Sequence, residues 1–238
     1  MREIVKLHQK HPAMGLDMIH QTIKPTHDCS RGRVHRLMKQ ANISSVRKKA
    51  YKRTTNSNHR NPIAKNLLMR NFACDKPNTI WVGDITYIPT GQGWLYLAIV
   101  KDLFTKKVVG YAFSKRIDSA LTIAAINMAV RRQKPSHGCI FHSDRGVQYA
   151  SNAFRKACDT HCIVQSMSRK GDPYDNAVAE NFFSCLKCEC VHLNHFDSRN
   201  DAQCEIFRYI EGFYNSLRPH SAIKWMSPNS FEASLCNA

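Results

Sequence analysis

The order of strand-like and helix-like segments between residues 79 and 191 constrains the fold more than any other feature of this sequence. Three strand patterns lie close together with short turns between them, as in an antiparallel meander, and two more follow. The strand patterns stand at 80–88, 94–102, 107–113, 139–143 and 163–167. Helical patterns at 119–133 and 151–161 separate the later strands, and a third follows at 176–190. This alternation predicts an α/β domain.

The first 43 residues have a different character and predict short helices. Within 31–41, apolar side chains recur at helical spacing, and Ser30 is available as the N-cap. Arg33 and Arg36 lie among the remaining positions of that helix. A basic helix that follows a shorter helix suits a helix-turn-helix-like DNA reader. A solvated amphipathic helix explains this stretch equally well.

Residues 44–78 lack periodicity and are strongly basic, which predicts a linker or an arm. Five of the seven residues in the segment RKKAYKR at 47–53 are basic: Arg47, Lys48, Lys49, Lys52 and Arg53. Such a segment can follow a phosphate backbone. The chain therefore divides into a helical segment at 1–43, a basic arm at 44–78 and a core at 79–238. A helix at 199–214 closes the core.

The charge of the whole chain points to a polyanionic partner. The 35 Lys and Arg against 18 Asp and Glu give a formal net charge of +17 over 238 residues. The expected partner is nucleic acid, and an anionic membrane surface is the alternative. No apolar run approaches the ~18 residues of a spanning helix, and no signal peptide is recognisable. We therefore expect a cytoplasmic protein that binds nucleic acid.

The ten cysteines do not form a convincing zinc or disulfide pattern. Seven are scattered singly, and the only cluster is Cys185, Cys188 and Cys190. One C-x2-C without a second pair is a weak zinc signal, and on a predicted helix such residues simply share a face. We expect the cysteines to be reduced and structural.

Three acidic residues stand where metal-dependent chemistry needs them. Asp84 lies inside the first strand pattern, where a charge is costly unless it is paired or bound to a metal. Asp144 ends the fourth strand pattern, and Glu180 lies in the first turns of the helix that begins near Asn176. These positions can converge on one edge of a sheet. Hard carboxylate oxygens suit two Mg²⁺ or Mn²⁺ ions about 3.5–4 Å apart, which act on phosphodiesters without a protein nucleophile.

The chain resembles the integrase-type D,D-35-E transposases of insertion sequences in three segments, WVGDITYI, FHSDRGVQYAS and KGDPYDNAVAENFFSCLKCE. Thirty-five residues separate Asp144 from Glu180, which is the spacing in the family's name. The likeness runs from about residue 79 to YNSLRPHSAIKWMSP, with a weaker likeness at HPAMG near the start. It implies an RNase H-like integrase core, a five-stranded mixed sheet with flanking helices, beside a small helical N-terminal domain.

The resemblance also implies the function and the site. The activity would be metal-dependent cleavage of the element's ends followed by strand transfer, with Asp84, Asp144 and Glu180 as catalytic residues and metal ligands. Lys187, seven residues after Glu180 and on the same helical face, would contact terminal DNA. His142 would orient a metal ligand or a phosphate, and Asn176 would face the site from one turn before Glu180. A structural histidine and a helix N-cap explain these two residues equally well.

Partners follow from the same resemblance. The chain would bind the element's terminal repeats and target DNA, and it would form a homo-oligomer because two ends must be brought together. An upstream reading frame supplies another DNA-binding helix-turn-helix in this family. We therefore expect that this chain is the downstream product, slightly truncated at its start, and that a protein of the upstream frame is a further partner.

Three alternatives compete with this interpretation. A viral-type integrase would carry an N-terminal His-His-Cys-Cys zinc module, and this segment has histidines and Cys29 but no C-x2-C pair. An RNase H-like nuclease would not need Lys187 or the basic arm. A catalytically silent DNA-binding protein, a decayed transposase acting as a repressor, would be unlikely to keep all three acids.

Overall fold

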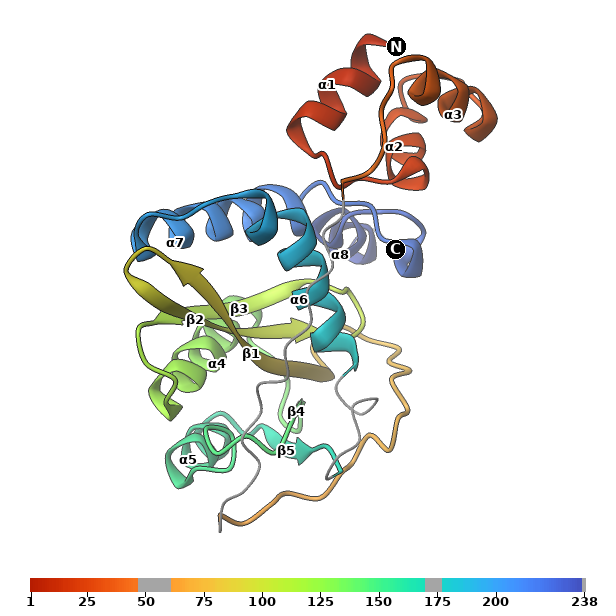
Figure 1. Ribbon diagram of the computed structural model, residues 1–238. Helices are drawn as coiled ribbons and strands as arrows, with labels where there is room; N and C mark the ends of the chain where they lie inside the picture. Colours follow the sequence, from red (N-terminus) through yellow and green to blue (C-terminus); the bar gives the residue numbers. More distant parts are fainter. Residues whose placement is uncertain (47–60, 170–176, 237–238) are drawn as a thin grey trace.

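The computed structural model describes residues 1–46, 61–169 and 177–236, and its centre is a five-stranded mixed sheet (Figure 1). The strands are β1 Ile80–Thr90, β2 Gly93–Asp102, β3 Val108–Ser114, β4 Ile140–Ser143 and β5 Val164–Met167. Their order in the sheet is β3-β2-β1-β4-β5. β1, β2 and β3 pair antiparallel, while β4 pairs parallel to β1 and β5 parallel to β4. The predicted meander and the predicted mixed sheet are confirmed.

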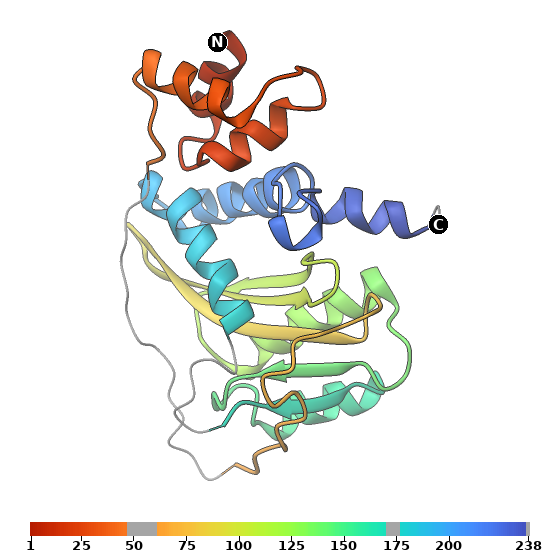
Figure 2. The same ribbon diagram turned by 90° about the vertical axis from the view of Figure 1, so that its right-hand side faces the viewer.

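Helices cover both faces of this sheet (Figures 1 and 2). They are α4 Ser119–Gln133, α5 Asn152–Thr160, α6 Ala177–Glu189, α7 Arg199–Phe207 and α8 Pro228–Cys236, with short 3-10 turns η2 Val191–Leu193 and η4 Ser221–Ile223. On one face, Trp81 and Phe141 pack with residues of α4 and α5. On the other, Leu97 and Ile99 pack with residues of α6 and α7. Alternate residues of the central strands thus enter two separate cores.

Gly110 in β3 marks the closest approach between the sheet and α4. A Cβ at this position would lie 2.3 Å from the carbonyl oxygen of Ala125 and 2.7 Å from the backbone nitrogen of Ala129. We expect Gly110→Ala to lower the free energy of unfolding by about 1–3 kcal/mol or more, because helix backbone cannot move aside as a side chain can. Chemical denaturation measures the change.

Gly212→Ala is the matched control, since a Cβ there would have no described atom within 4 Å apart from its chain neighbours and the backbone of its own helix. It should leave stability unchanged or raise it slightly. Equal destabilisation by the two substitutions would contradict the close packing of β3 on α4.

The N-terminal segment forms three helices, α1 Arg2–Lys10, α2 Leu16–Ile23 and α3 Arg31–Gln40, which lie beside the C-terminal helices (Figure 2). The Ser30 side chain accepts a hydrogen bond from the Arg33 backbone N–H, so the predicted N-cap is confirmed. Val34 and Met38 are buried, whereas Arg33 and Arg36 are exposed. The basic side of α3 therefore faces away from the small core of this segment.

The helix expected at 199–214 changes its winding part-way. α7 ends at Phe207, and the chain continues as a π-helical segment, η3 Arg208–Tyr214. This change of winding still leaves one apolar side buried, which contains Ile206, Tyr209, Ile210 and Phe213. The backbone N–H of Asn215 bonds to the Ile210 carbonyl, and this wider turn delivers the Asn215 side chain to the sheet.

Both outer strands of the sheet are bonded to other parts of the chain. At β3, the Asn215 side chain accepts from the Val108 N–H and donates to the Val108 carbonyl, both at 3.0 Å. At β5, the Met167 N–H bonds to the Lys65 carbonyl and the Ser166 hydroxyl accepts from the Leu67 N–H. Segments far apart in sequence thus satisfy strand groups that would otherwise face water.

Several other expectations can be compared with the structure. The nine cysteines whose side chains are described are all free of disulfide bonds. Within the described ranges, no helix has the length and apolar character that crossing a membrane requires. The arm at 47–53, with Arg47, Lys48, Lys49, Lys52 and Arg53, lies outside the described residues, as does Asn176.

Candidate active site

Asp84 and Asp144 lie where β1 and β4 separate. The two strands pair in parallel from Ile80 opposite Ile140 to Val82 opposite His142. Asp84 and Asp144 stand two residues beyond that last pair, each at the same distance from it. Alternate residues of a strand point to the same face, so Asp84 lies on the side of the sheet where Val82 packs with Ala179 of α6. Asp144, in the turn after β4, acts on Asp84 through its charge, and the two carboxylates therefore flank the opening on this side.

Asp84 is held beside other acids. Its Oδ1 accepts a hydrogen bond of 2.7 Å from the Ile85 N–H. Burial raises the pKa of the Asp84 carboxyl well above its usual range, and the charge of Asp144 adds to this. Glu180 acts in the same direction, while the Ile85 N–H and the Lys187 ammonium oppose the shift. The charges of both other carboxylates that the sequence singles out thus oppose the ionisation of Asp84.

Asp144 and Glu180 complete this group of acids. Asp144 Oδ1 accepts a 2.9 Å hydrogen bond from the Gly146 N–H, which holds the carboxylate in the turn after β4. Glu180 lies in the first turn of α6 and is exposed over part of its side chain. Burial of the remaining part raises the pKa of its carboxyl, and the charge of Asp144 raises this pKa further. Three carboxylates that oppose one another's ionisation make a region where a cation is favoured.

Lys187 lies on the same helix as Glu180 and next to Asp84. Its ammonium is 5.7 Å from the centroid of the Tyr87 ring. Burial lowers the pKa of Lys187, and the charge of Asp84 opposes that change. The predicted shared face of Lys187 and Glu180 therefore brings a cation to the rim of the acidic group. Sequence reasoning did not include Tyr87, whose ring lies beneath that cation.

His142 is fully buried under the acidic group. Its Nδ1 lies 2.8 Å from the Ser166 hydroxyl and its Nε2 lies 3.3 Å from the Ser168 hydroxyl. Both contacts join β4 to the chain at and just after β5. These two contacts support a structural role for His142. Its role in orienting a metal ligand or a phosphate stays a prediction.

Tyr149 is a residue near the acids that sequence reasoning missed. Its hydroxyl is buried, and the described residues supply it with no hydrogen-bond partner. Burial, together with the charges of Asp84 and Asp144, raises the pKa of this phenol well above its usual range. The only signal in the sequence was its place in the GVQYAS segment that follows Asp144.

The donor set has the chemistry for a hard divalent cation, because all three acids offer carboxylate oxygens. The three acids do not, however, form a complete metal-binding site by themselves. Across 1–46, 61–169 and 177–236, no three His, Cys, Asp or Glu side chains stand close enough to hold one ion.

Substitution of Asp84 tests the mutual repulsion directly. Because folding raises the pKa of this carboxyl, its ionisation costs stability once the pH exceeds about 4, the ordinary value for an aspartate. Asp84→Asn can keep the Ile85 hydrogen bond and removes the charge. We expect it to stabilise the metal-free protein at pH 7 by on the order of 1 kcal/mol.

Thermal unfolding in a chelator at pH 7 and at pH 4 measures this effect, with the exposed Asp159→Asn as control. The advantage of Asp84→Asn should shrink at the lower pH, where Asp84 is already protonated. A stability gain of the same size in both variants would argue against repulsion at Asp84.

Comparison with known proteins places the chain in a family. Residues 75–173 and 161–228 match two integrase core domain families, and residues 1–51 match the HTH-like domain family. The "Insertion element IS600 uncharacterized 31 kDa protein" of Shigella sonnei is 44% identical over 201 residues, which cover 84% of this chain and 74% of that protein. The chain belongs to the insertion-sequence transposases. "Transposase InsF for insertion sequence IS3A" of Escherichia coli K12 is 44% identical over 174 residues, 73% of this chain and 60% of that transposase.

Solved structures agree on the fold. A chain of the simian T-cell lymphotropic virus intasome, in complex with PP2A regulatory subunit B56 gamma, aligns with a TM-score of 0.55 and 19% identity. The alignment covers 96% of this transposase-family chain and 73% of the viral one. The integrase core and the helical N-terminal domain expected from sequence are thereby confirmed. The HTH-like and integrase-core matches also indicate DNA as the partner.

Proposed function

We propose that this chain cleaves the ends of an insertion sequence and joins them to DNA, with Asp84, Asp144 and Glu180 as the metal-binding catalytic residues. The observation that carries the proposal is the opening between β1 and β4. Two of the acids flank it at equal register, and the third begins the helix that covers the same side of the sheet. The chain that carries these acids belongs to the insertion-sequence transposases, and we infer the reaction from that family.

The chemistry rests on what these side chains can hold. Two Mg²⁺ or Mn²⁺ ions, when bound, would stabilise the attacking and leaving oxygens of an in-line phosphodiester displacement. Asp84 and Asp144 would supply ligands from opposite sides of the opening, and Glu180 would supply ligands from α6. A bound cation would relieve the repulsion that raises the pKa of Asp84 and of Glu180.

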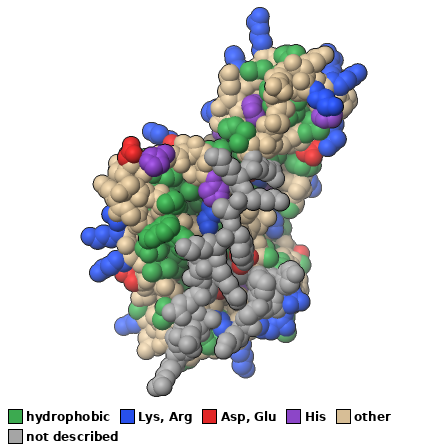
Figure 3. Space-filling model, viewed as in Figure 1, with side chains coloured by type: hydrophobic (Ala, Val, Ile, Leu, Met, Phe, Trp, Pro, Cys, Tyr) green, Lys and Arg blue, Asp and Glu red, His purple; other side chains and the backbone are tan. Residues whose placement is uncertain are grey.

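DNA would be held by basic groups outside the acids. Lys187 lies at the rim of the acidic group, and the exposed Arg33 and Arg36 of α3 are placed to contact DNA from the HTH-like domain. The arm at 47–53 would add sequence-independent contacts to phosphates. On the face drawn in Figure 3, Lys and Arg are far more frequent than Asp and Glu, which suits this partner.

Assembly and location complete the proposal. Two element ends must meet for joining, so the active form would be a homo-oligomer. A protein of the element's upstream frame would be a second protein partner, and the complex would act at the bacterial nucleoid.

The test is incubation of the protein with its element's own end sequences and Mg²⁺, scoring cleavage and joining separately. The proposal requires both products with Mg²⁺ and neither in a chelator. Cleavage without joining would favour the RNase H-like nuclease. DNA binding without either product would favour the silent repressor.

Lys187 separates a transposase from a simple nuclease. We expect Lys187→Ala to keep cleavage of generic DNA with metal but to lose most joining activity and most preference for the terminal sequence. Lys187→Arg should keep more of both, because its charge and reach survive although its head group differs. Strand transfer with matched and scrambled ends, at fixed salt, measures the difference. If Lys187→Ala joins both substrates as the unsubstituted chain does, Lys187 has no part in recognition.

A further inference from the structure

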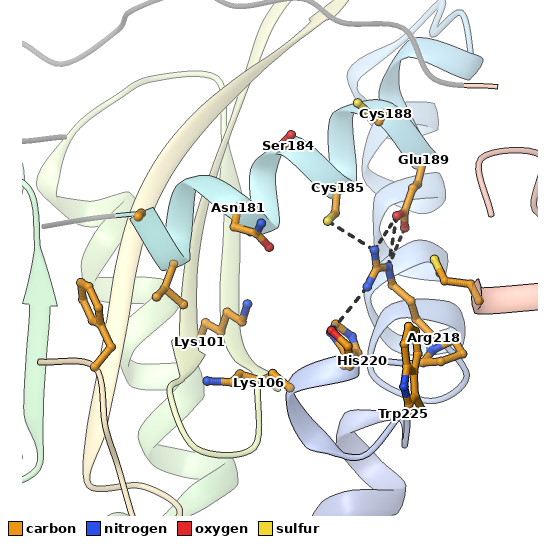
Figure 4. Close-up of a pocket in the computed structure, with 17 residues that line it drawn as sticks. Lys101, Lys106, Asn181, Ser184, Cys185, Cys188, Glu189, Arg218, His220 and Trp225 are labelled. Atoms are coloured by element: carbon orange, nitrogen blue, oxygen red, sulfur yellow. Dashed lines mark hydrogen bonds and ion pairs between the residues drawn. The ribbon is translucent and has the colours of Figure 1, made fainter. Parts of the chain in front are cut away.

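A groove separate from the acidic group lies between α6 and the C-terminal segment. Its cavity measures about 610 Å³. Asn181, Cys185 and Cys188 line it from α6, and Arg218 and His220 line it from the opposite wall (Figure 4). On the helix, these α6 positions are turned away from Glu180 and Lys187 by about a quarter turn or more. The groove is therefore a second feature of the same helix.

A buried lysine points into this groove. Lys101 is only 3% exposed, yet its ammonium end is directed toward the cavity (Figure 4). In residues 1–46, 61–169 and 177–236, no hydrogen bond or ion pair reaches this ammonium, which lies 5.7 Å from the centroid of the Tyr214 ring. A lysine in the interior is normally paired because desolvation of its charge is costly. Lys101 thus lacks a partner that its position calls for.

The groups around Lys101 are mostly cations. Lys106 also lines the groove, and its ammonium donates one hydrogen bond to the Leu103 carbonyl, which leaves two N–H groups available. The acid on the wall, Glu189, is already bonded by Arg218 and Tyr209. The groove therefore carries two ammonium groups to which no carboxylate of the described residues is bonded, although the charge of Asp102 favours the protonated form of Lys106.

We propose that this groove binds a phosphate group, held by the Lys101 and Lys106 ammoniums. Lysine serves as a point charge for phosphates, and an anion between the two ammoniums would balance both. The cavity is larger than one phosphate, so the group would belong to a larger molecule. The sources that share this chemistry are a phosphate of bound DNA and a free phosphorylated metabolite.

The pKa of Lys101 should make anion binding in the groove depend on pH. Burial lowers the pKa of Lys101 to about 7; Cys185 opposes this shift, while Lys106 and Arg218 add to it. Burial and the nearby cations lower the pKa of His220 to about 3, so this imidazole stays neutral at physiological pH. Glu189 remains paired with Arg218, and Cys188 is the other thiol on the α6 wall. Anion binding should weaken as the pH rises above about 7, where Lys101 loses its proton.

Sulfate is a suitable probe because its charge does not change over this pH range. The measurement is the rise in melting temperature caused by low millimolar sulfate, against chloride at equal ionic strength. We expect Lys101→Met to weaken sulfate binding at least about tenfold, since charge-assisted hydrogen bonds are lost. Lys106→Met should weaken it to a smaller degree, and it carries the test if Lys101→Met does not fold.

Lys156→Met is the matched control, because Lys156 is an exposed lysine on α5. It should keep the full response to sulfate, which also accounts for any general stabilisation by this salt. An equal response in the unsubstituted protein, Lys101→Met, Lys106→Met and Lys156→Met overturns the proposal.

DNA binding distinguishes the two sources of phosphate. If the site takes the DNA backbone, Lys101→Met should reduce the slope of log affinity against log salt by about 0.9, the value for one lost phosphate contact. If sulfate binding is lost and the slope is unchanged, the site takes a free phosphorylated molecule. Only the DNA source rests on the proposed function. The sulfate measurement needs no transposition activity, so the two proposals can fail separately.

Discussion

We expect Asp144→Asn to reduce both DNA cleavage and strand joining by about three orders of magnitude or more, because loss of a metal ligand removes several kcal/mol of transition-state stabilisation. Affinity for the terminal DNA should stay nearly unchanged, since the basic groups that bind phosphates are untouched. The assay combines end cleavage, strand transfer and a DNA-binding measurement on the same preparation. Asp84→Asn and Glu180→Gln should behave in the same way.

Asp159→Asn provides the comparison for this experiment. Asp159 is an exposed aspartate of α5, outside the acidic group, and its substitution should leave all three measurements as they were. Full activity of Asp144→Asn would remove Asp144 from the proposed site. A parallel loss of DNA binding would instead indicate a general disturbance of the turn that Asp144 and Gly146 form.

The second large effect is expected in stability, at the ion pair between α6 and the C-terminal segment. The Glu189 side chain is 6% exposed and that of Arg218 is 11% exposed, with their closest atoms 2.7 Å apart. Glu189 also accepts a 2.8 Å hydrogen bond from the Tyr209 hydroxyl. We expect Glu189→Ala to lower the free energy of unfolding by about 3–5 kcal/mol, because it leaves the Arg218 charge buried without its counter-ion.

An exposed pair on the neighbouring helix gives the control. Glu205 and Arg208 approach to 3.3 Å, with side chains 41% and 75% exposed. Glu205→Ala should cost about 0–1 kcal/mol, the usual range for a surface salt bridge. Urea denaturation of both variants measures the difference, and a similar cost for the two would show that the Glu189 pair does not hold the C-terminal segment on α6.

Local patterns in the sequence predicted most of the fold. Strand formers in IWVGDITYI and the helical spacing at 119–133 depend only on neighbouring residues, and β1 and α4 lie there. Ser30 capped its helix as predicted, because that hydrogen bond spans only three residues. The change to π-helical winding at Arg208 was not predicted, since it satisfies a distant bond between Asn215 and Val108.

The candidate site was predictable in composition but not in geometry. The three acids were visible in their motifs, whereas their common opening depends on the pairing of Val82 with His142, which no local pattern encodes. Lys101 stood in the strand pattern WLYLAIVKD as a charge among apolar residues, and that was a signal. Its groove arises only when the segment around Arg218, which lies more than 100 positions after Lys101 in the sequence, folds back along α6.

The side-chain amide of Asn215 and the carbonyl of Lys65 have a consequence for how copies of this protein meet. Each occupies part of an outer strand that could otherwise accept a strand from another molecule. Free outer strands are a common route to fibrils and to strand-exchanged dimers. Because backbone groups of both outer strands are already hydrogen-bonded within the chain, this sheet is a poor template for the addition of another strand. A complex that gathers two DNA ends would then have to be built from helical surfaces and loops, where a contact can form and release without disturbing the strands that carry Asp84 and Asp144.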